Sequence, residues 1–307
     1  MKKILTIDGG GIKGVFAASF LAELEDMCRI KIGDYFDLIA GTSTGGIIAA
    51  AIALGIPAQK ILQLYLENGK MIFPVHRRFP LFHGKYNSAP LENILSEIFG
   101  SYCLKDCKTR LLIPAFNLIS KKVKVFKTSH AQDLYYDKDL AIKDCLLATT
   151  AAPTYFNPYK MEGGVFVDGG IGANNPSLIA LVEGITRCGW LSSEISLLSI
   201  GGVTEFGIVT GNEKMGLLHV NKIVKCFMEA ESQYAENICN IMLPHGQYFR
   251  INQMVEHGQV SLDKVSEKSL SRLKDLGVDS AVRYVDDIKQ NFLYNKADKV
   301  QFCNLEG

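Results

Sequence analysis

The chain has 307 residues, of which 48% are hydrophobic and 21% charged, and its formal net charge at pH 7 is +1. This balance allows a sizeable buried core, and it excludes a strongly basic protein that binds nucleic-acid polymers through its overall charge. The sequence opens with Met1-Lys2-Lys3 and passes at once into an apolar strand, so we expect no secretory signal and a cytoplasmic location.

The first predicted strand, Ile4 to Ile7, runs into the glycine-rich segment Asp8-Gly9-Gly10-Gly11-Ile12-Lys13-Gly14, and a predicted helix follows. Glycines let a backbone approach a ligand closely, and the N-terminus of the next helix adds free N–H groups. We therefore expect this loop to bind an anion. Gly9, Gly11 and Gly14 also fit the dinucleotide-binding pattern G-x-G-x-x-G, so a nucleotide-binding module is an alternative interpretation.

The second predicted strand, Phe36 to Ala40, ends in Gly41-Thr42-Ser43-Thr44-Gly45 and leads into an apolar helix that ends near Leu54. A strand that passes through G-x-S-x-G into a helix is typical of a nucleophile elbow, which exposes a serine hydroxyl on a tight turn. A dinucleotide-binding fold would instead need an acidic residue at the end of this strand. The two segments together fit a nucleophile, Ser43, facing an oxyanion hole in the glycine loop.

Regular elements continue after the elbow. Between two of the predicted helices, the segment Lys70 to Lys85 mixes prolines, aromatic residues and basic residues, which fits either an ordered loop with inward-packed aromatic side chains or a mobile flap. We predict helices at Pro57–Glu67, Ala89–Phe99 and Asp139–Leu147, and a hairpin of strands at Arg110–Ile119 and Val123–Lys127 at one edge of the sheet.

A third motif is the short strand Gly164 to Asp168, which ends in a carboxylate before Gly169 and Gly170. An acid at the end of a strand in an α/β sheet lies where ligands bind, so Asp168 is the natural base for Ser43. A dry pocket would raise the pKa of this carboxyl and make it a better base. His219, His245 and His257 come late enough for a histidine triad, but none follows a strand in a recognisable turn.

The remaining pattern predicts a strand at Glu194–Ile200, a helix at Lys214–Asn240, a strand at Tyr248–Asn252 and a helix at Gly277–Tyr294. Alternating strands and helices favour an α/β fold with a mainly parallel sheet covered on both faces. We expect one domain over residues 1–307, with the catalytic motifs within 1–201 and a helical C-terminal extension, 204–307, packed on it.

The three motifs resemble, in order and separation, those of the patatin-like phospholipases, and the resemblance covers roughly Lys3 to Gly201, including Ala151-Ala152-Pro153-Thr154-Tyr155-Phe156. It implies a three-layer α/β/α enzyme without cofactor or metal, in which a Ser43–Asp168 dyad cleaves fatty-acyl esters of membrane glycerophospholipids. Lys13 stands where the family usually has arginine, which puts a bidentate role there in doubt. The resemblance implies oxyanion donors at Gly9, Gly10, Gly11 and Thr44, and supporting roles for Asp8, Lys13, Gly14, Gly41, Gly45, Gly169 and Gly170.

More loosely, the compact length, the lysine-containing glycine loop and residues 151–156 resemble the short bacterial patatin-like effectors of anti-phage CBASS systems. This resemblance implies a cyclic oligonucleotide activator, formation of a homo-oligomer on activation, and peripheral association with the membrane during catalysis. Three alternatives remain: a carboxylesterase or lysophospholipase acting on smaller esters, a dinucleotide-binding module that uses Gly9–Gly14, and a storage or scaffold protein with a relic site. The intact serine, aspartate and glycines weigh against the last of these.

Overall fold

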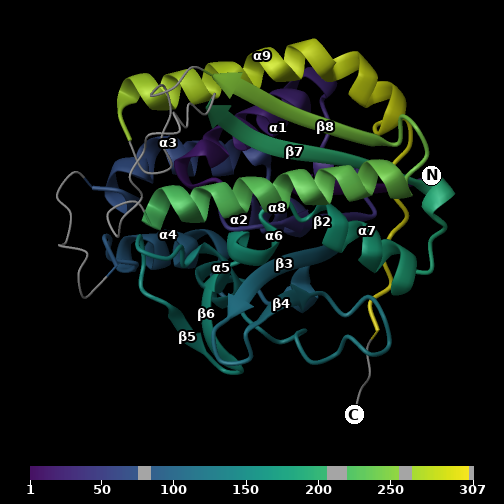
Figure 1. The fold of residues 1–307 in the computed structure, drawn as a ribbon. Helices are drawn as coiled ribbons and strands as arrows, with labels where there is room; N and C mark the ends of the chain where they lie inside the picture. Colours follow the sequence, from purple (N-terminus) through teal and green to yellow (C-terminus); the bar gives the residue numbers. More distant parts are fainter. Residues whose placement is uncertain (75–83, 206–219, 256–264, 304–307) are drawn as a thin grey trace.

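The structure is a computed structural model that describes residues 1–74, 84–205, 220–255 and 265–303 (Figure 1). Within these residues the centre of the molecule is one eight-stranded sheet with the strand order β5-β6-β3-β2-β1-β7-β8, and β4 pairs with β3 beside this path. The strands are β1 (Lys2–Ile7), β2 (Leu38–Gly41), β3 (Arg110–Asn117), β4 (Lys122–Lys127), β5 (Tyr159–Met161), β6 (Gly164–Asp168), β7 (Ile195–Glu205) and β8 (Tyr248–Val255).

Most of the sheet is parallel, as the sequence pattern predicts. Five adjacent strands run parallel to one another, in the order β3, β2, β1, β7 and β8. Strands β4 and β6 both pair antiparallel with β3, and β5 pairs antiparallel with β6. The predicted hairpin is therefore present as β3 and β4. The last strand, β8, comes from the C-terminal part of the chain. This part therefore contributes a strand to the sheet in addition to its helices.

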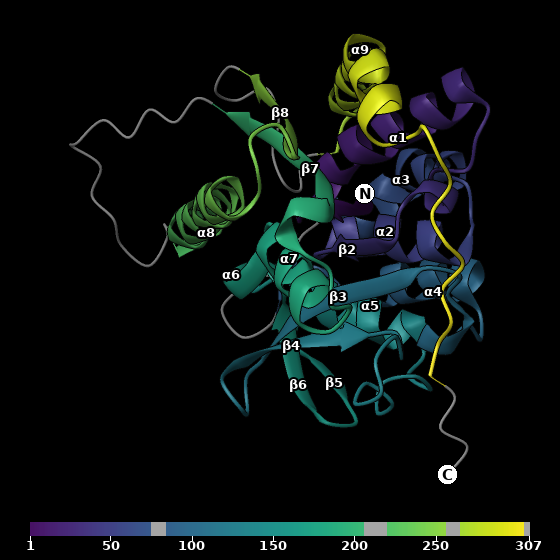
Figure 2. The same cartoon turned by 90° about the vertical axis from the view of Figure 1, so that its right-hand side faces the viewer.

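Helices cover both faces of the sheet, which gives the predicted three layers (Figure 2). On one face α2 and α5 pack against the central strands, and α1, α3 and α9 lie around them. On the other face α7 packs against β1, β2 and β7, and α8 lies against α6 and α7. The helices are α1 (Gly14–Cys28), α2 (Thr44–Leu54), α3 (Ala58–Ile72), α4 (Ala89–Phe99), α5 (Ile142–Thr150), α6 (Gly170–Ala173), α7 (Ser177–Thr186), α8 (Val220–Met242) and α9 (Glu267–Asn291).

The two faces of the sheet pack into separate hydrophobic cores, because successive side chains of a strand point to opposite sides. In β1, Ile4 joins the core beneath α7, with Leu181, while Leu5 and Ile7 join the larger core around α1 and α2. Every residue of α2 is buried. A helix in this position must be apolar all round, which explains the uncharged sequence after the elbow.

The last helix differs most from the sequence-based expectation. We predicted a start at Gly277, but α9 begins at Glu267, where the Ser266 hydroxyl accepts a hydrogen bond from the backbone N–H of Ser269. Gly277 instead lies inside the helix, at its contact with α1: a Cβ there would lie 2.6 Å from the backbone oxygen of Phe16. The glycine therefore marks a close helix crossing and not a helix boundary.

The helix predicted at Lys214–Asn240 corresponds to α8, Val220–Met242, and residues 214–219 lie outside the described part of the chain. Across the described ranges, none of the helices combines the length and the apolar character that crossing a membrane requires.

Candidate active site

The predicted nucleophile elbow is present between β2 and α2. Ser43 has φ 53° and ψ −124°, a strained backbone conformation that active sites often use. The flanking glycines are required by space: a Cβ on Gly41 would lie 2.2 Å from the backbone oxygen of Gly45, and a Cβ on Gly45 would lie 2.3 Å from that of Ile7. The turn therefore accepts no side chain at positions 41 and 45, two residues before and two residues after the serine.

Ser43 and Asp168 meet directly, although they are far apart in the sequence. The Ser43 hydroxyl donates a hydrogen bond of 2.6 Å to Asp168 Oδ2, and the backbone N–H of Gly170 donates one of 2.7 Å to Oδ1. Both side chains are buried. Burial raises the pKa of Asp168 to about 6, although the hydrogen bonds from Ser43 and Gly170 act to lower it. The carboxylate is thus a stronger base than in water and still mostly ionised at pH 7.

Thr149, at the end of α5, fixes the backbone of the serine and was not found from the sequence. Its hydroxyl accepts a hydrogen bond of 2.9 Å from the backbone N–H of Ser43 and donates one of 2.6 Å to the backbone oxygen of Pro114. Thr149 belongs to no motif, because a threonine in the last turn of a buried helix has no distinctive sequence pattern. Only the packing of α5 on the sheet brings it to the elbow.

The glycine loop lies beside the serine, but its members differ in role. Gly10, Gly11 and Thr44 line the same cavity as Ser43. The N–H of Gly9 donates a hydrogen bond of 3.1 Å to the backbone oxygen of Asn174, so the structure does not leave it for an oxyanion, contrary to our expectation. Gly11 has φ 58°, in the region that favours glycine.

Lys13, the residue that departs from the usual family pattern, reaches the neighbouring strand β7. Its side chain is buried, and its ammonium donates a hydrogen bond of 2.6 Å to the backbone oxygen of Val203 in β7. This hydrogen bond to a carbonyl oxygen needs only one N–H donor, which a lysine supplies as well as an arginine. Lys13 therefore ties the glycine loop to the neighbouring strand.

The cavity around the dyad is mainly apolar. Ser43, Asp168 and the glycine loop form one wall, and α2, α3, α4, α8 and the segment before β5 supply the others. Such a cavity suits a hydrocarbon chain whose polar end lies at the serine. The apolar side chains that line it are Ile47, Tyr65, Ile72, Phe73, Leu91, Pro153, Tyr155, Phe156, Ile171, Val224 and Met228.

Part of the segment Lys70 to Lys85 packs inward. The ring centroid of Phe73 lies 5.4 Å from that of Tyr86 and 6.0 Å from that of Phe156. Phe73, the residue that follows α3, therefore packs inward beside the cavity. Residues 75–83 lie outside the described part of the chain. They include the other aromatic and basic residues of the possible flap, except Lys70 and Lys85.

Among the residues that the structure describes around this cavity, none is a histidine. His245 is exposed, and His219 and His257 lie outside the described ranges. The buried His130 is held by Thr128 and Glu183. Within the same described ranges, no cluster of three or more His, Cys, Asp or Glu residues has the arrangement of a metal site.

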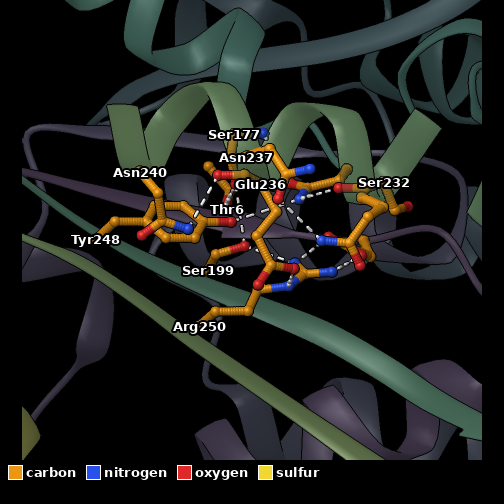
Figure 3. Close-up of polar contacts among 12 residues, drawn as sticks. Thr6, Ser177, Ser199, Ser232, Glu236, Asn237, Asn240, Tyr248 and Arg250 are labelled. Atoms are coloured by element: carbon orange, nitrogen blue, oxygen red, sulfur yellow. Dashed lines mark hydrogen bonds and ion pairs between the residues drawn. The ribbon is translucent and has the colours of Figure 1, made fainter. Parts of the chain in front are cut away.

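A buried polar network links the glycine loop to β8 (Figure 3). The guanidinium of Arg250 forms two hydrogen bonds to the Asp8 carboxylate, of 2.8 and 2.5 Å, and a third of 2.6 Å to the Ser199 hydroxyl. The Ser199 hydroxyl is hydrogen-bonded to the Ser177 hydroxyl, which is hydrogen-bonded to the Thr6 hydroxyl in β1. The C-terminal strand β8 therefore holds the first residue of the glycine loop by a bidentate ion pair, a strong and directional contact.

Helix α8 joins the same network from the other side. Glu231 accepts a hydrogen bond of 3.0 Å from the backbone N–H of Asn175, and the Asn174 side chain donates one of 2.9 Å to the Ser232 hydroxyl. Burial raises the pKa of Glu231 to about 6. Asn174 also accepts from Gly9, so α8 fixes both the segment after Asp168 and the start of the glycine loop. No sequence motif pointed to these C-terminal contacts.

A sheet that presents a serine on an elbow beside a buried aspartate defines a serine hydrolase with a Ser–Asp arrangement. The model of the patatin-like phospholipases matches residues 5–181, more than half of the chain. The chain belongs to the patatin-like phospholipase family.

Relatives match nearly the whole chain. A cGAMP-activated phospholipase of Escherichia coli (strain TW11681) is 33% identical, and the alignment covers 96% of this chain and 93% of the relative. A protein of the same description from Pseudomonas aeruginosa is also 33% identical, over 96% of this chain and 92% of the relative. Among solved structures, VipD from Legionella pneumophila has a TM-score of 0.51 at 15% identity, covering 93% of this chain and 67% of VipD, which supports the fold.

Proposed function

We propose that this protein hydrolyses fatty-acyl esters of membrane glycerophospholipids, with Ser43 as nucleophile and Asp168 as general base. The observation that carries this proposal is the 2.6 Å hydrogen bond from the Ser43 hydroxyl to a buried aspartate, on an elbow beside an apolar cavity. Membership of the patatin-like phospholipase family supports an acyl lipid as the substrate.

In the first half of the reaction, Ser43 Oγ attacks the carbonyl carbon of the lipid ester and transfers its proton to Asp168 Oδ2. The oxygen of the tetrahedral intermediate lies at the N–H groups of Gly10, Gly11 and Thr44, where the positive end of α2 also favours negative charge. The bond to the alcohol oxygen then breaks, and Asp168 returns the proton to that oxygen. The lysolipid leaves, and the fatty acid stays as an ester of Ser43.

In the second half, a water molecule gives a proton to Asp168 and attacks the acyl carbonyl carbon. The tetrahedral intermediate breaks at the Ser43 oxygen, which takes the proton back from Asp168. The products are a free fatty acid and the original enzyme. The apolar cavity lined by Tyr155, Phe156 and Met228 holds the acyl chain through both halves.

We further propose that a cyclic dinucleotide activates the enzyme. Three relatives, each at least 32% identical over most of the chain, are described as cGAMP-activated phospholipases, which supports this proposal. A ligand shifts an enzyme toward an active state only through a higher affinity for that state. We propose that the active enzyme self-associates and binds to the membrane surface.

The test measures fatty-acid release from phospholipid vesicles by purified protein, with and without cGAMP, together with light scattering. We expect release and scattering to rise over the same cGAMP range, and a fluorophosphonate probe to label Ser43. Full release in the absence of cGAMP would contradict activation but not the dyad. Hydrolysis of small esters or lysolipids alone, under every condition, would favour a carboxylesterase or lysophospholipase.

A further inference from the structure

A second cavity lies at the opposite end of the sheet from Ser43. It has a volume of about 450 Å³, within the range of small-ligand pockets. Its walls come from the residues just before β2 and β3, from the C-terminal end of α2, and from residues 296–302. The active site, in contrast, lies where β1 and β2 end. The cavity is therefore separate from the lipid site.

Three lysines in this cavity are available for an anion. Lys31, Lys108 and Lys299 are exposed there, and within the described residues none of them forms a salt bridge with an acidic side chain. Three ammonium groups around one cavity create a positive potential that favours a compact ligand with more than one negative charge.

The acidic residues that line the cavity form their salt bridges and hydrogen bonds with groups other than Lys31, Lys108 and Lys299. Asp34 pairs with Lys296 at 2.9 Å, and Asp298 pairs with Lys2 at the same distance. The two oxygens of Glu25 accept hydrogen bonds from the backbone N–H groups of Ile32 and Ala58. Asp34 and Asp298 therefore offset other lysines, whereas Glu25 keeps its negative charge and interacts electrostatically with Lys31. The unbalanced positive charge of the cavity lies at Lys108 and Lys299.

One side of the cavity is apolar. Ile52, Ile56, Val300 and Phe302 line it beside the lysines. An aromatic ring in this setting can stack on a nucleic-acid base, a contact that every base can make. A cavity that combines several cations with an apolar wall matches a ligand that carries phosphates on one side and bases on the other.

Two other cavities, both near the glycine loop, fit such a ligand less well. The cavity around Ser43 is apolar, and a third cavity beside Arg250 has cations that are already bound. There, Lys13 donates to Val203, Arg250 pairs with Asp8, and Lys225 lies 3.6 Å from Glu229. Of these three cavities, the lysine-lined cavity is thus the best match for a dianion.

We propose that this lysine-lined cavity binds the cyclic dinucleotide activator, with Lys31, Lys108 and Lys299 at its two phosphates and Phe302 against a base. This inference rests on the proposed activation by cGAMP. The C-terminal segment that forms one wall descends on the side of the molecule opposite α8 (Figure 2). This segment is anchored at both ends. The backbone N–H of Ala297 donates a hydrogen bond of 2.8 Å to the backbone oxygen of Asp34, and that of Cys303 donates one of 2.8 Å to the backbone oxygen of Ser129.

Helix α2 connects this cavity to the nucleophile. The Lys108 ammonium lies 2.9 Å from the position of a Cβ on Gly55, which ends α2 with φ 80°. Ser43 precedes the first residue of the same helix, roughly 16 Å away at 1.5 Å per residue. A phosphate at Lys108 therefore changes the charge at one end of the helix whose other end carries the elbow.

The test is a double charge reversal, Lys108→Glu with Lys299→Glu. We expect calorimetry to show cGAMP binding at least about 30-fold weaker, because two charge-assisted contacts are lost. Activation of fatty-acid release from vesicles should be lost, while hydrolysis of a small soluble ester stays unchanged. The matched control reverses Lys122 and Lys160, which are equally exposed on β4 and β5, and should bind cGAMP like the wild type.

Three results would overturn the proposal in different ways. Unchanged cGAMP binding by the double variant would place the activator elsewhere and leave the proposed function intact. No cGAMP binding by the wild type would overturn both the site and the activation, while soluble-ester hydrolysis still reports the dyad. Equal binding of inorganic pyrophosphate and cGAMP would show a general anion site. If the double variant fails to fold, the variant Phe302→Ala tests the site instead. It should weaken the binding of cGAMP but not that of pyrophosphate, and unchanged cGAMP binding would overturn the proposal.

Discussion

Ser43 is the proposed nucleophile, so the variant Ser43→Ala should lose fatty-acid release by at least about a thousandfold. The hydroxyl makes one hydrogen bond, to Asp168, and its removal leaves no cavity of significant size. We therefore expect a thermal unfolding midpoint close to that of the wild type. Substantial hydrolysis by a folded Ser43→Ala protein would show that another residue is the nucleophile.

Asp168 should set the pH dependence. A protonated carboxyl cannot accept the serine proton, and the pKa of this group is raised to about 6. The value of kcat/KM for a soluble ester should therefore be constant above this pKa and fall about tenfold per pH unit below it. Asp168→Asn should remove both the activity and this acid limb. A residual activity with a pKa near 7 in that variant would indicate a histidine base.

Thr149 should matter for turnover although it does not touch the substrate carbonyl. Thr149→Val keeps the shape of the side chain but removes the acceptor for the Ser43 N–H, so the strained elbow loses a fixed partner. We expect kcat to fall about tenfold and the free energy of unfolding to fall by about 1–3 kcal/mol, with KM little changed. The control is Thr186→Val, an exposed threonine that only bonds within its own helix.

Among the elements, β8 has a specific role at the glycine loop. Arg250→Ala would leave the buried Asp8 carboxylate without its partner, which costs about 3–5 kcal/mol. We expect a lower unfolding midpoint and a lower kcat. Arg250→Lys should restore part of both, because it keeps the charge but not the two parallel hydrogen bonds. Arg187→Ala, which removes an exposed ion pair to Asp133, should change neither.

The sequence predicted those elements whose pattern depends on local rules. The strand before Ser43 and the helix after it follow from an apolar run interrupted by a glycine turn, and Asp168 follows from a strand that ends in an acid. Thr149 and Arg250 could not be predicted, because their partners are distant in the sequence and their surroundings carry no motif. The predicted start of α9 was wrong because Gly277 lies inside the helix, where α9 packs closely on α1. This tertiary contact overrides the local propensity of glycine to end a helix.

For the whole molecule, we expect one cooperative unfolding transition. The C-terminal part supplies β8 to the sheet and packs α9 on α1, so we expect it to unfold together with the catalytic motifs. Calorimetry should give equal calorimetric and van't Hoff enthalpies. A fragment of residues 1–201 should be insoluble or unfolded, since it would expose the apolar faces of β7 and α1. Two separate transitions in the whole chain would contradict a single domain.

The ion pair between Asp8 and Arg250 spans 242 positions of the chain. A ribosome that adds 5–20 residues per second needs roughly 10–50 s to make that stretch. Throughout this time the glycine loop has been synthesised but the strand that holds it has not. The nascent chain therefore has a glycine loop whose first residue, Asp8, lacks its ion-pair partner for most of the time of synthesis. Strand order thus makes the glycine loop one of the last parts of the proposed active site to be fixed, when the chain is nearly complete.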